Sequence, residues 1–378
     1  MANNNENKVL NVPHLRFPEF GGDWKMERLD EIATLSKGIG ISKEELSDDG
    51  EPCILYGELY TKYKSEIINE IYSKTDIDNS KLKRSNANDV IIPCSGETAE
   101  DIATARCIPF DNILLGGDLN IISLHQHNGA FMSYQLNGKR KFDIARVAQG
   151  VSVVHLYGEH LKAIMTYNPC LQEQQKIAKL LSLIDERIAT QNKIIDKLQS
   201  LIKGLAAQLT QSGTPNIRLC DCLECHSSTL QENCVSVTGS YPVYGATGLI
   251  GYTNNYAYNG ESILIVKDGS GVGSLSYVND HFSVIGTLNY LTAKENYSIL
   301  YLYYALMAFN FTPYITGMAI PHIYFKDYGK AKLFYPSIEK RIRIASLLHN
   351  IEQKLVVEQN LVISLSAQKS YLLRMLFI

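Results

Sequence analysis

The densest group of possible metal ligands lies just after the middle of the chain. Cys220, Cys222, Cys225 and His226 include a Cys-x-x-Cys spacing of the kind that binds zinc. A closed structural zinc site needs four ligands, and Cys234 is the other cysteine nearby. The alternative is that these cysteines are small buried hydrophobic residues. We favour that alternative and predict no metal site, although the sequence does not settle whether the cluster binds metal.

Motifs for cofactor or catalytic chemistry are weak. Residues 269–273 read GSGVG, but a dinucleotide-binding loop must open a helix, and the strand-like SLSYV follows. The sequence holds no GxxxxGK[ST], HExxH or GxSxG. Residues 168–171 read NPCL, which lacks the second proline and the aromatic residue of the amino-methyltransferase motif. We therefore expect no catalytic residues and no cofactor bound by this chain.

Basic and aromatic residues offer candidates for DNA contact. In residues 60–84 the cations could meet phosphates and the tyrosines could pack on sugars or bases; the candidates are Tyr60, Lys62, Tyr63, Lys64, Lys81, Lys83 and Arg84. Acidic residues dilute this charge, so a solvated insertion is an equal alternative. Lys139, Arg140 and Lys141 form a denser basic patch.

Further candidates lie in the second half of the chain, on expected loops. Asn254, Asn255, Lys267 and Ser270 carry side chains that can read base edges. Turn chemistry alone also explains asparagine and serine at such positions.

An internal repeat organises these residues. Residues 169–209 align without a gap with residues 336–376 at a shift of 167, and the shift grows to 190 upstream. The chain is therefore two copies of one unit, each a mixed α+β part followed by a long helix. The first copy carries about 15 extra residues between Tyr60 and Asp89. In this alignment Cys222 and Cys225 fall on Ile32 and Leu35, on the apolar face of a helix expected in RLDEIATL, which favours the buried-hydrophobe interpretation.

Each long helix carries a heptad pattern with apolar residues at steps of four and three, which predicts a coiled coil. From Ile177 to Leu209 the pairing positions include Ile184, Ile188, Gln191, Ile195 and Leu198; from Ile344 to Leu376 they include Ile351, Leu355, Glu358, Val362 and Leu365. Gln191 and Glu358 are equivalent in the repeat. They are either solvated defects or, as we prefer, a polar layer that fixes register. Lys369 also occupies a pairing position, where the helix could fray or touch a partner.

The globular parts have short strands and turns. Residues 262–266 and 274–278 predict strands, and residues 297–309 predict a buried amphipathic helix. We expect a leader at 1–24, recognition-type domains at 25–168 and 213–335, and long helices at 169–212 and 336–378. The fold class is α+β, with two tandem domains and the two helices paired as an antiparallel coiled coil.

Composition limits the class of protein. With 378 residues, 45% hydrophobic and 20% charged, the chain suits two or three folded domains. The net charge of −3 excludes a polycationic nucleic-acid coat but permits DNA binding on one face. Neither a signal peptide nor a membrane span is expected, and eight scattered cysteines favour a cytoplasmic protein.

The whole pattern resembles a known family. VPHLRFPEFGGDWKMERLDEIA near the start, YPVYGATGLIGYTNN at 241–255, and two copies of P-x(4–6)-Q/R-x-x-IA-x-LL before a long helix are similar to the specificity subunit of type I restriction–modification systems. The similarity extends from Val12 to the end of the chain.

The resemblance implies a non-catalytic DNA-binding subunit. Each globular part would read one half of a split, asymmetric DNA site, and the helices would set the spacer. They would also dock two methyltransferase subunits, which use S-adenosylmethionine; restriction subunits would use ATP and Mg²⁺. Two alternatives stay open: a coiled-coil adaptor that binds only proteins, and a DNA-modifying enzyme whose active site is not recognised.

Overall fold

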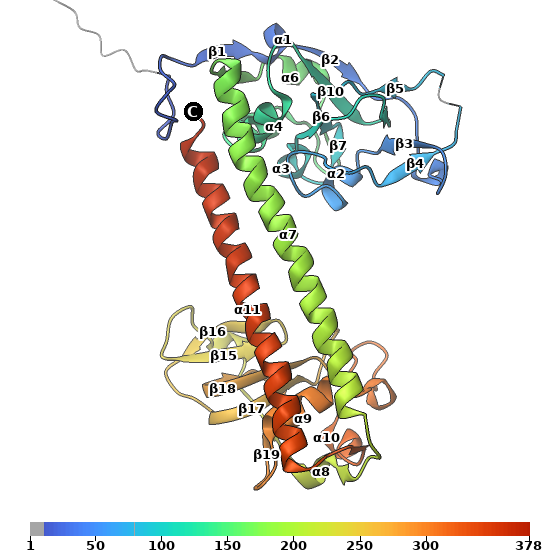
Figure 1. The fold of residues 1–378 in the computed structure, drawn as a ribbon, viewed down its shortest axis with the longest axis vertical. Coiled ribbons are helices and arrows are strands. Elements are labelled where there is room, and N and C mark those ends of the chain that lie inside the picture. The colour runs from blue at the N-terminus through green and yellow to red at the C-terminus, as the bar shows by residue number, and fades with distance from the viewer. Residues whose placement is uncertain (1–10, 79) are drawn as a thin grey trace, which may run out of the picture. The chain divides into compact units, whose positions relative to one another are not determined.

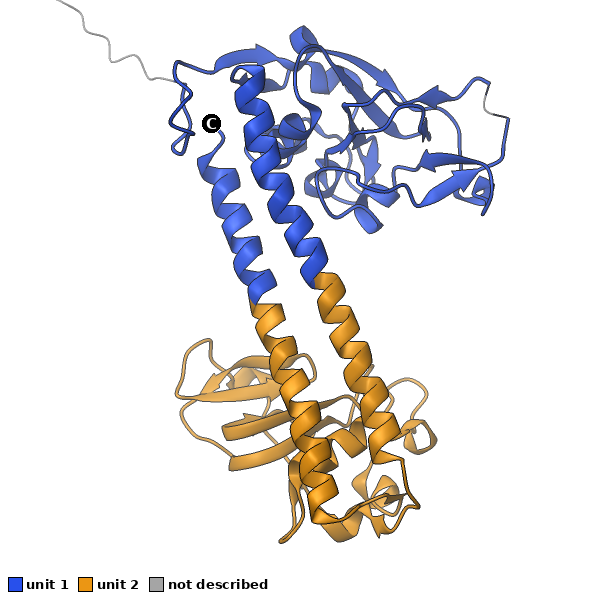
Figure 2. Ribbon diagram, in the orientation of Figure 1, with its two compact units in different colours: residues 1–191, 361–378 blue, residues 192–360 orange. Residues whose placement is uncertain are grey.

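The structure is a computed structural model that describes residues 11–78 and 80–378. The chain forms two compact units: the first comprises the residues up to 191 together with 361–378, and the second comprises residues 192–360 (Figure 2). The expected leader at 1–24 falls partly outside the described residues. Among the described helices, none is long and apolar enough to cross a membrane.

The first unit contains two four-stranded sheets, ordered β2-β10-β6-β8 and β4-β3-β9-β5, and the pairs β1-β12 and β7-β11 (Figure 1). Its strands are β1 (Lys25–Arg28), β2 (Ala33–Lys37), β3 (Glu51–Ile54), β4 (Ser73–Thr75), β5 (Lys83–Arg84), β6 (Asp89–Pro93), β7 (Ser95–Gly96), β8 (Arg106–Ile108), β9 (Leu114–Leu115), β10 (Leu119–Leu124), β11 (Val154–His155) and β12 (Met165–Asn168). Its shorter helices are α1 (Leu29–Ile32), η1 (Lys43–Glu45), α2 (Glu58–Thr61), α3 (Ala99–Ile102), α4 (Gly129–Asn137), α5 (Lys141–Val147) and α6 (Gly158–Lys162).

The second unit is built on one six-stranded sheet, ordered β14-β19-β17-β18-β15-β16, with the pair β13-β20 beside it. Its strands are β13 (Ile217–Arg218), β14 (Leu223–Ser227), β15 (Tyr241–Gly245), β16 (Gly248–Thr253), β17 (Tyr258–Val266), β18 (Leu275–Val284), β19 (Leu288–Ala293) and β20 (Lys332–Leu333). Its shorter helices are α8 (Leu219–Cys222), η2 (Glu232–Cys234), α9 (Ile299–Met307), η3 (Thr312–Tyr314) and α10 (Phe325–Tyr328).

The internal repeat is confirmed strand by strand. In the first unit β10 lies between β2 and β6; in the second β19 lies between β14 and β17. The sequence shifts of 190, 169 and 173 place β2 on β14, β10 on β19 and β6 on the end of β17. The helices α1 and α4 likewise correspond to α8 and α9. Both units are therefore built on the same set of elements, which we call the frame: β2, β10, β6, α1 and α4 in the first unit, and β14, β19, β17, α8 and α9 in the second. The loops of each unit extend from this frame.

Several predicted elements are confirmed. Residues 262–266 end β17, residues 275–278 begin β18, and the GSGVG segment between them is a turn rather than the start of a helix. Gly269 and Gly273 adopt φ of 99° and 85°, which the turn needs and which glycine tolerates. The helix expected at 297–309 is α9, whose tyrosines and leucines lie in the core.

The helix expected in RLDEIATL is wrong in length. Only the single turn of α1 forms, and Ala33 already pairs with Leu124 in the β2–β10 ladder. Since Thr34 and Leu35 gain backbone partners on β10, the chain extends instead of continuing the helix. The second unit repeats this, so Cys222 ends α8 while Cys225 lies on β14.

Two long helices complete the fold. α7 (Leu171–Thr210) has 40 residues, about 60 Å of helix, and α11 (Ile338–Met375) has 38. Both begin two residues after a proline, Pro169 and Pro336. Every heptad position predicted from Ile177 to Leu209 and from Ile344 to Leu376 is buried or half-buried.

The helices pack antiparallel within each unit. In the first unit Ile177 and Leu181, near the start of α7, share a cluster with Leu376 and Phe377 at the end of α11. In the second, Ile202 and Ala206 of α7 share the core with the beginning of α11. Lys369 does not fray the second helix, which continues to Met375.

The polar interruptions of the heptad pattern are buried to different degrees. Glu358 is 9% exposed and accepts a hydrogen bond from Lys354 Nζ at 2.9 Å, one turn earlier on α11. Gln191 is half-buried, and its Oε1 has no hydrogen-bond partner among residues 11–78 and 80–378. Both side chains therefore carry a desolvation cost that a leucine would avoid.

Replacing Gln191 and Glu358 together by leucine is expected to raise the melting temperature while loosening helix register. Apolar substitutes for buried polar groups commonly stabilise, whereas polar seam residues specify one alignment. Thermal denaturation measures the first effect, and hydrogen exchange along α7 and α11 measures the second. An unchanged or lower melting temperature would contradict the prediction.

Candidate nucleic-acid interface

Each globular part is fastened to a long helix by tyrosine–carboxylate hydrogen bonds. In the first unit Tyr134 of α4 donates to Asp185 Oδ2 of α7 at 2.7 Å. In the second, Tyr303 and Tyr304 of α9 donate to the two oxygens of Glu352 on α11, at 2.9 and 2.6 Å. Since α4 and α9 correspond residue by residue, Tyr134 corresponds to Tyr304, and Asp185 corresponds to Glu352 in the repeat. The same bond therefore fixes each loop-bearing frame on its helix.

The first unit adds a buried ion cluster at this junction. Lys369 Nζ lies 2.6 Å from Asp185 Oδ1 and 2.5 Å from Glu66 Oε2, and all three side chains are at most 15% exposed. Glu66 belongs to the segment where the first copy carries its extra residues. The cluster thus joins α7, α11 and that segment.

Two of the five basic candidates of residues 60–84 form ion pairs within the protein. Lys62 contacts Glu58 and Ser73, each at 2.7 Å, and Arg84 pairs with Glu51 at 2.6 Å. Lys83 lies half-buried on β5, while Lys64 and Lys81 are exposed. Lys64 and Lys81 therefore remain candidates for contact with phosphates, whereas Lys62 and Arg84 are already paired with carboxylates.

The two tyrosine candidates of that segment differ. Tyr63 is 5% exposed and packs in the core against Ile68 and its neighbours, so its proposed contact with bases is wrong. Tyr60 is half-buried, lines a cavity and donates its hydroxyl to the Ser95 carbonyl at 2.9 Å. Burial raises the pKa of both phenols, so both keep their protons.

The patch at 139–141 is partly structural. Arg140 donates to the Ile378 carbonyl at 2.9 Å, pairs with Asp143 at 3.2 Å and lies over the Tyr167 ring. Lys139 and Lys141 are half-buried beside it. Arg140 therefore holds the end of the chain against the first unit.

The second-unit candidates lie on two separate loops. Asn254 and Asn255 are exposed and line a hollow of about 320 Å³ with Tyr256. Lys267 lies 3.9 Å from Asp268 at the end of β17, and Ser270 is exposed three residues later. The structure keeps these residues accessible but does not bring them into one site.

A cavity of about 700 Å³ in the first unit has the chemistry of a base-edge reader. Tyr56, Tyr60, Glu97, Asp101 and Arg106 are among its lining residues. Carboxylates accept from the amino groups of cytosine and adenine, and tyrosine hydroxyls can donate or accept. Arg106 is held on the Tyr63 carbonyl at 3.1 and 3.2 Å, and burial lowers its pKa. The cavity is therefore our main candidate for base contact in this unit.

Sequence reasoning missed most of this cavity. Glu97 and Asp101 fall outside the basic segments, and carboxylates have no electrostatic attraction to phosphates that would mark them as DNA contacts. One signal was available: Gly96 aligns with Gly269 in the repeat, which places residues 95–97 just after a central strand, where the structure has the short strand β7 and Glu97.

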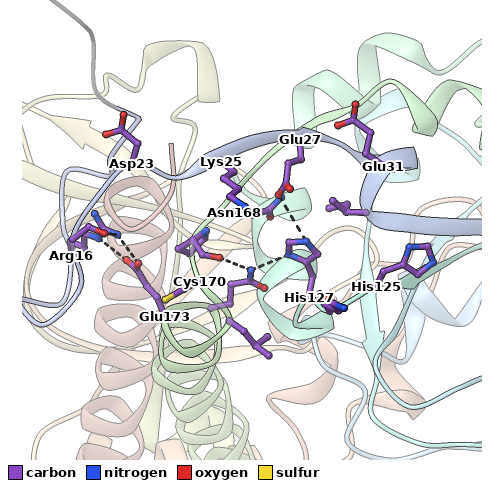
Figure 3. A pocket seen from close by; sticks show the side chains of 16 residues that line it. Arg16, Asp23, Lys25, Glu27, Glu31, His125, His127, Asn168, Cys170 and Glu173 are labelled. Atoms are coloured by element: carbon purple, nitrogen blue, oxygen red, sulfur yellow. Dashed lines mark hydrogen bonds and ion pairs between the residues drawn. The ribbon is translucent and has the colours of Figure 1, made fainter.

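A second cavity of about 590 Å³ surrounds the first turn of α7 (Figure 3). Arg16 forms two bonds to the Glu173 carboxylate, at 2.7 and 2.8 Å, and Gln174 bonds to His127 and to the Pro169 carbonyl. These bonds attach the leader and the loop at 125–127 to the start of the helix.

The charges of this second cavity disfavour DNA. Asp23, Glu27, Glu31 and Glu173 supply four carboxylates against the two cations Arg16 and Lys25, so the lining is net negative and repels phosphates. Burial lowers the pKa of His127, which favours its neutral form. We therefore interpret this cavity as a structural junction.

The cysteine cluster matches the buried-hydrophobe interpretation only at some positions. Cys222 is fully buried, and burial raises its thiol pKa to about 12. Cys225 is half-buried on β14, with a pKa of about 11, while Cys220 is half-buried and Cys234 is exposed. Within the described residues, no group of three or more His, Cys, Asp or Glu side chains has the geometry of a metal site.

Comparison with solved structures supports the arrangement of the fold. The chain is similar to the S subunit of a type I restriction–modification system from M. genitalium, with a TM-score of 0.71 and 19% identity over 97% of this chain and 99% of that one. A second structure, titled as the structural basis of complex assembly and conformational transition of the type I R-M system, gives a TM-score of 0.52 at 15% identity over 96% of this chain and 98% of that one. At these identities the similarity concerns the fold.

Similarity in sequence is more local. The specificity subunit of the type I restriction enzyme EcoprrI from Escherichia coli is 28% identical over 112 residues, 30% of this chain and 28% of that protein. The MjaVIII specificity subunit of Methanocaldococcus jannaschii is 29% identical over 203 residues, 53% of this chain. The chain covers less than half the length of each of these relatives, 28% and 44%.

The family itself is identified by matches in both halves of the chain. Residues 21–200 and 217–365 each match the type I restriction modification DNA specificity domain. These ranges contain the frame and most of the long helix of each repeat, and together they cover most of the sequence. The chain therefore belongs to the family of type I restriction modification DNA specificity domains, which it carries twice in tandem.

Proposed function

We propose that this chain is the DNA-specificity subunit of a type I restriction–modification complex, in which each globular part reads one half of a split, asymmetric site. The observation that carries the proposal is the repetition of one frame with different loop residues. The β2-β10-β6 and β14-β19-β17 arrangements are the same, whereas residues 95–97, which follow β6, differ in sequence from the equivalent residues 268–270, which follow β17. Two domains with the same fold but different residues at the candidate base-contacting positions would recognise two different half-sites.

The long helices are proposed to act as spacer and as docking surface for two methyltransferase subunits. Outside the heptad positions they expose apolar side chains, as protein-binding surfaces do: Leu171, Leu183 and Leu201 on α7, and Ile338, Ile342, Leu347, Val356, Val357, Ile363 and Tyr371 on α11. Leu171 and Ile338 are equivalent in the repeat. This one equivalent pair, at the start of each helix, is where identical partners would meet equivalent surfaces.

Catalysis is assigned to the partner subunits. In this proposal the methyltransferase subunits bind S-adenosylmethionine, the restriction subunits use ATP and Mg²⁺, and this chain binds neither cofactor. The complex would act on cellular DNA in the cytoplasm.

Co-expression of the chain with the methyltransferase subunit encoded beside it tests the proposal. Mapping methylated adenines across the host DNA is expected to give one split, asymmetric motif. Exchange of residues 25–168 for those of a homologue should then alter one half-site alone. A stable complex without new methylation would favour a protein adaptor, and methylation by the purified chain alone would favour an enzyme.

The spacer function makes a separate prediction. Inserting one heptad into each of α7 and α11 adds about 10 Å of helix, and DNA rises about 3.4 Å per base pair. The unspecified spacer of the methylated motif is therefore expected to lengthen by up to about three base pairs, with both half-sites retained. Changed half-sites with an unchanged spacer would contradict the spacer assignment.

A further inference from the structure

Both units carry the same closed loop. In the first unit Gln149 and His155 exchange both backbone hydrogen bonds, at 2.9 and 2.7 Å, and enclose residues 150–154. In the second, Thr316 and His322 do the same at 2.9 and 2.8 Å, around residues 317–321. We call residues 149–155 and 316–322 the finger loops.

The attachment of each finger loop is also the same. Leu156, which follows the first loop, donates its N–H to the Cys94 carbonyl at the end of β6. Ile323 donates likewise to the carbonyl of Lys267, at the end of the chain segment that forms β17. The fingers therefore project from equivalent points of the two frames.

A glycine is required at the start of each finger. Gly150 has φ of 127° and Gly317 has φ of 88°, conformations that other residues rarely adopt. A Cβ added at Gly150 would lie 2.1 Å from the Val153 carbonyl oxygen, and one at Gly317 would lie 2.3 Å from that of Ile320. Since both copies keep this turn, its shape is needed in both.

The tips of the fingers are apolar and solvent-exposed. The exposed fractions are 98% for Val151 and 53% for Val153, and 105% for Met318 and 66% for Ile320. These pairs are equivalent in the repeat. Exposed side chains gain nothing from the protein's own core, so folding stability does not explain two apolar residues at each tip.

Each finger lies beside the candidate base-reading loops. Ser152 and Val153 line the cavity that also contains Tyr56, Glu97 and Asp101. In the second unit Gly269, which precedes Ser270, donates its N–H to the Pro321 carbonyl of the finger at 2.9 Å. A ligand that binds the candidate base-contacting residues of either unit therefore also contacts the finger loop of that unit.

We propose that each finger loop is an apolar wedge that contacts DNA and presses its two exposed side chains against bases at the edge of its own half-site. This inference rests on the proposed function. Apolar side chains contact thymine methyl groups or enter between base steps, and neither contact needs a cation. One finger in each unit matches one half-site for each unit. Each finger lies beside polar residues that are candidates for contact with bases. This position favours DNA as the partner of the finger over a methyltransferase subunit, which the long helices would bind.

The test uses the complex of this chain with its methyltransferase subunits and duplexes that carry the mapped site. Val151→Ser with Val153→Ser forms one variant, and Met318→Ser with Ile320→Ser forms the other. Each is expected to weaken binding to the specific site about 10- to 100-fold. The slope of log affinity against log salt should stay unchanged, because no phosphate contact is lost.

A fluorescent adenine analogue, 2-aminopurine, locates the contact. It is placed at successive positions of each half-site, and its fluorescence is expected to change when the unaltered complex binds. The first variant should abolish this change in one half-site, and the second variant should abolish it in the other. Phe142→Ser, at 68% exposure, and Val237→Ser, at 90%, are the matched controls and should leave affinity and fluorescence unchanged.

Two results would overturn the wedge. Unchanged specific binding in both variants would show that the fingers do not contact DNA. Loss of methyltransferase subunits from the purified complex, measured by native mass spectrometry, would identify the fingers as protein-docking loops. If the unaltered complex methylates no specific sequence, the proposed function fails and the wedge with it; a sequence-specific complex indifferent to the fingers rejects the wedge alone.

Discussion

Replacing Lys369 by alanine is expected to lower the free energy of unfolding of the first unit by about 3–5 kcal/mol. The lysine ammonium lies between the carboxylates of Glu66 and Asp185, which are 11% and 9% exposed. Without it, two buried carboxylates face each other, and Arg106, which interacts electrostatically with both, is the cation that remains near them. The loss of stability comes from leaving buried charges unpaired. This loss is several times larger than the stability that an exposed ion pair contributes.

The effect should depend on pH. Burial raises the pKa of the Asp185 carboxyl, the Glu66 carboxylate raises it further, and Lys369 opposes the shift. A carboxyl with a raised folded pKa binds more protons in the folded state than in the unfolded state, so stability falls as the pH rises past the unfolded pKa. The Lys369→Ala variant has no ammonium group to oppose this effect. The loss of unfolding free energy that it suffers relative to the unaltered protein is therefore expected to be larger at pH 8 than at pH 5.

The single tryptophan makes this measurement specific. Trp24 is 1% exposed and packs against Phe131 and Phe377 in the first unit, so urea unfolding followed by its fluorescence reports that unit. Lys162→Ala is the matched control, because its ion pair with Glu159 is exposed; we expect less than about 1 kcal/mol. A deficit for Lys369→Ala below that of the control, or one that grows toward pH 5, would show that the cluster is not held by its charge.

Every heptad position predicted for the two helices is buried or half-buried, because burial along a helix repeats locally with the sequence; Ala206, which is fully buried, lies outside the predicted pattern. The partners of Lys369 could not be predicted in this way. Asp185 lies on the other helix and Glu66 lies about 300 positions away, in the segment with the extra residues of the first copy. The position equivalent to Lys369 in the first helix is Ile202, so the repeat gave no guide either.

Local acidic residues explain the main errors at the candidate DNA surface. Lys62 and Arg84 pair with Glu58 and Glu51, two acidic residues that precede the basic segment in the sequence. Charge composition predicts that a segment is basic, but not whether its cations face solvent. Tyr63 was misjudged for a similar reason, since an aromatic residue beside lysines can equally belong to a core. Contacts distant in sequence, rather than composition, form the cavity of Tyr56, Asp101 and Arg106.

Replacing Glu352 by alanine is expected to destabilise the second unit by about 2–5 kcal/mol. Its carboxylate accepts the hydroxyls of Tyr303 and Tyr304, which are 4% and 0% exposed. Each buried hydroxyl left without an acceptor costs about 1–3 kcal/mol. Burial raises the pKa of both phenols, so neither can avoid this cost by losing its proton in the neutral range.

The tyrosines themselves provide the control for that loss. In a background of Tyr303→Phe with Tyr304→Phe, Glu352→Ala should cost far less, since no hydroxyl remains to be orphaned; the difference is the coupling energy of the anchor. Glu352→Gln retains an acceptor oxygen and should fall between the two. Hydrogen exchange of the α9 amides measures the local effect, which should exceed any shift in the Trp24-monitored unfolding of the first unit. Equal costs in both backgrounds would mean that Glu352 acts through α11 alone, and the repeated tyrosine–carboxylate bond would then not be what holds the second recognition frame to its helix.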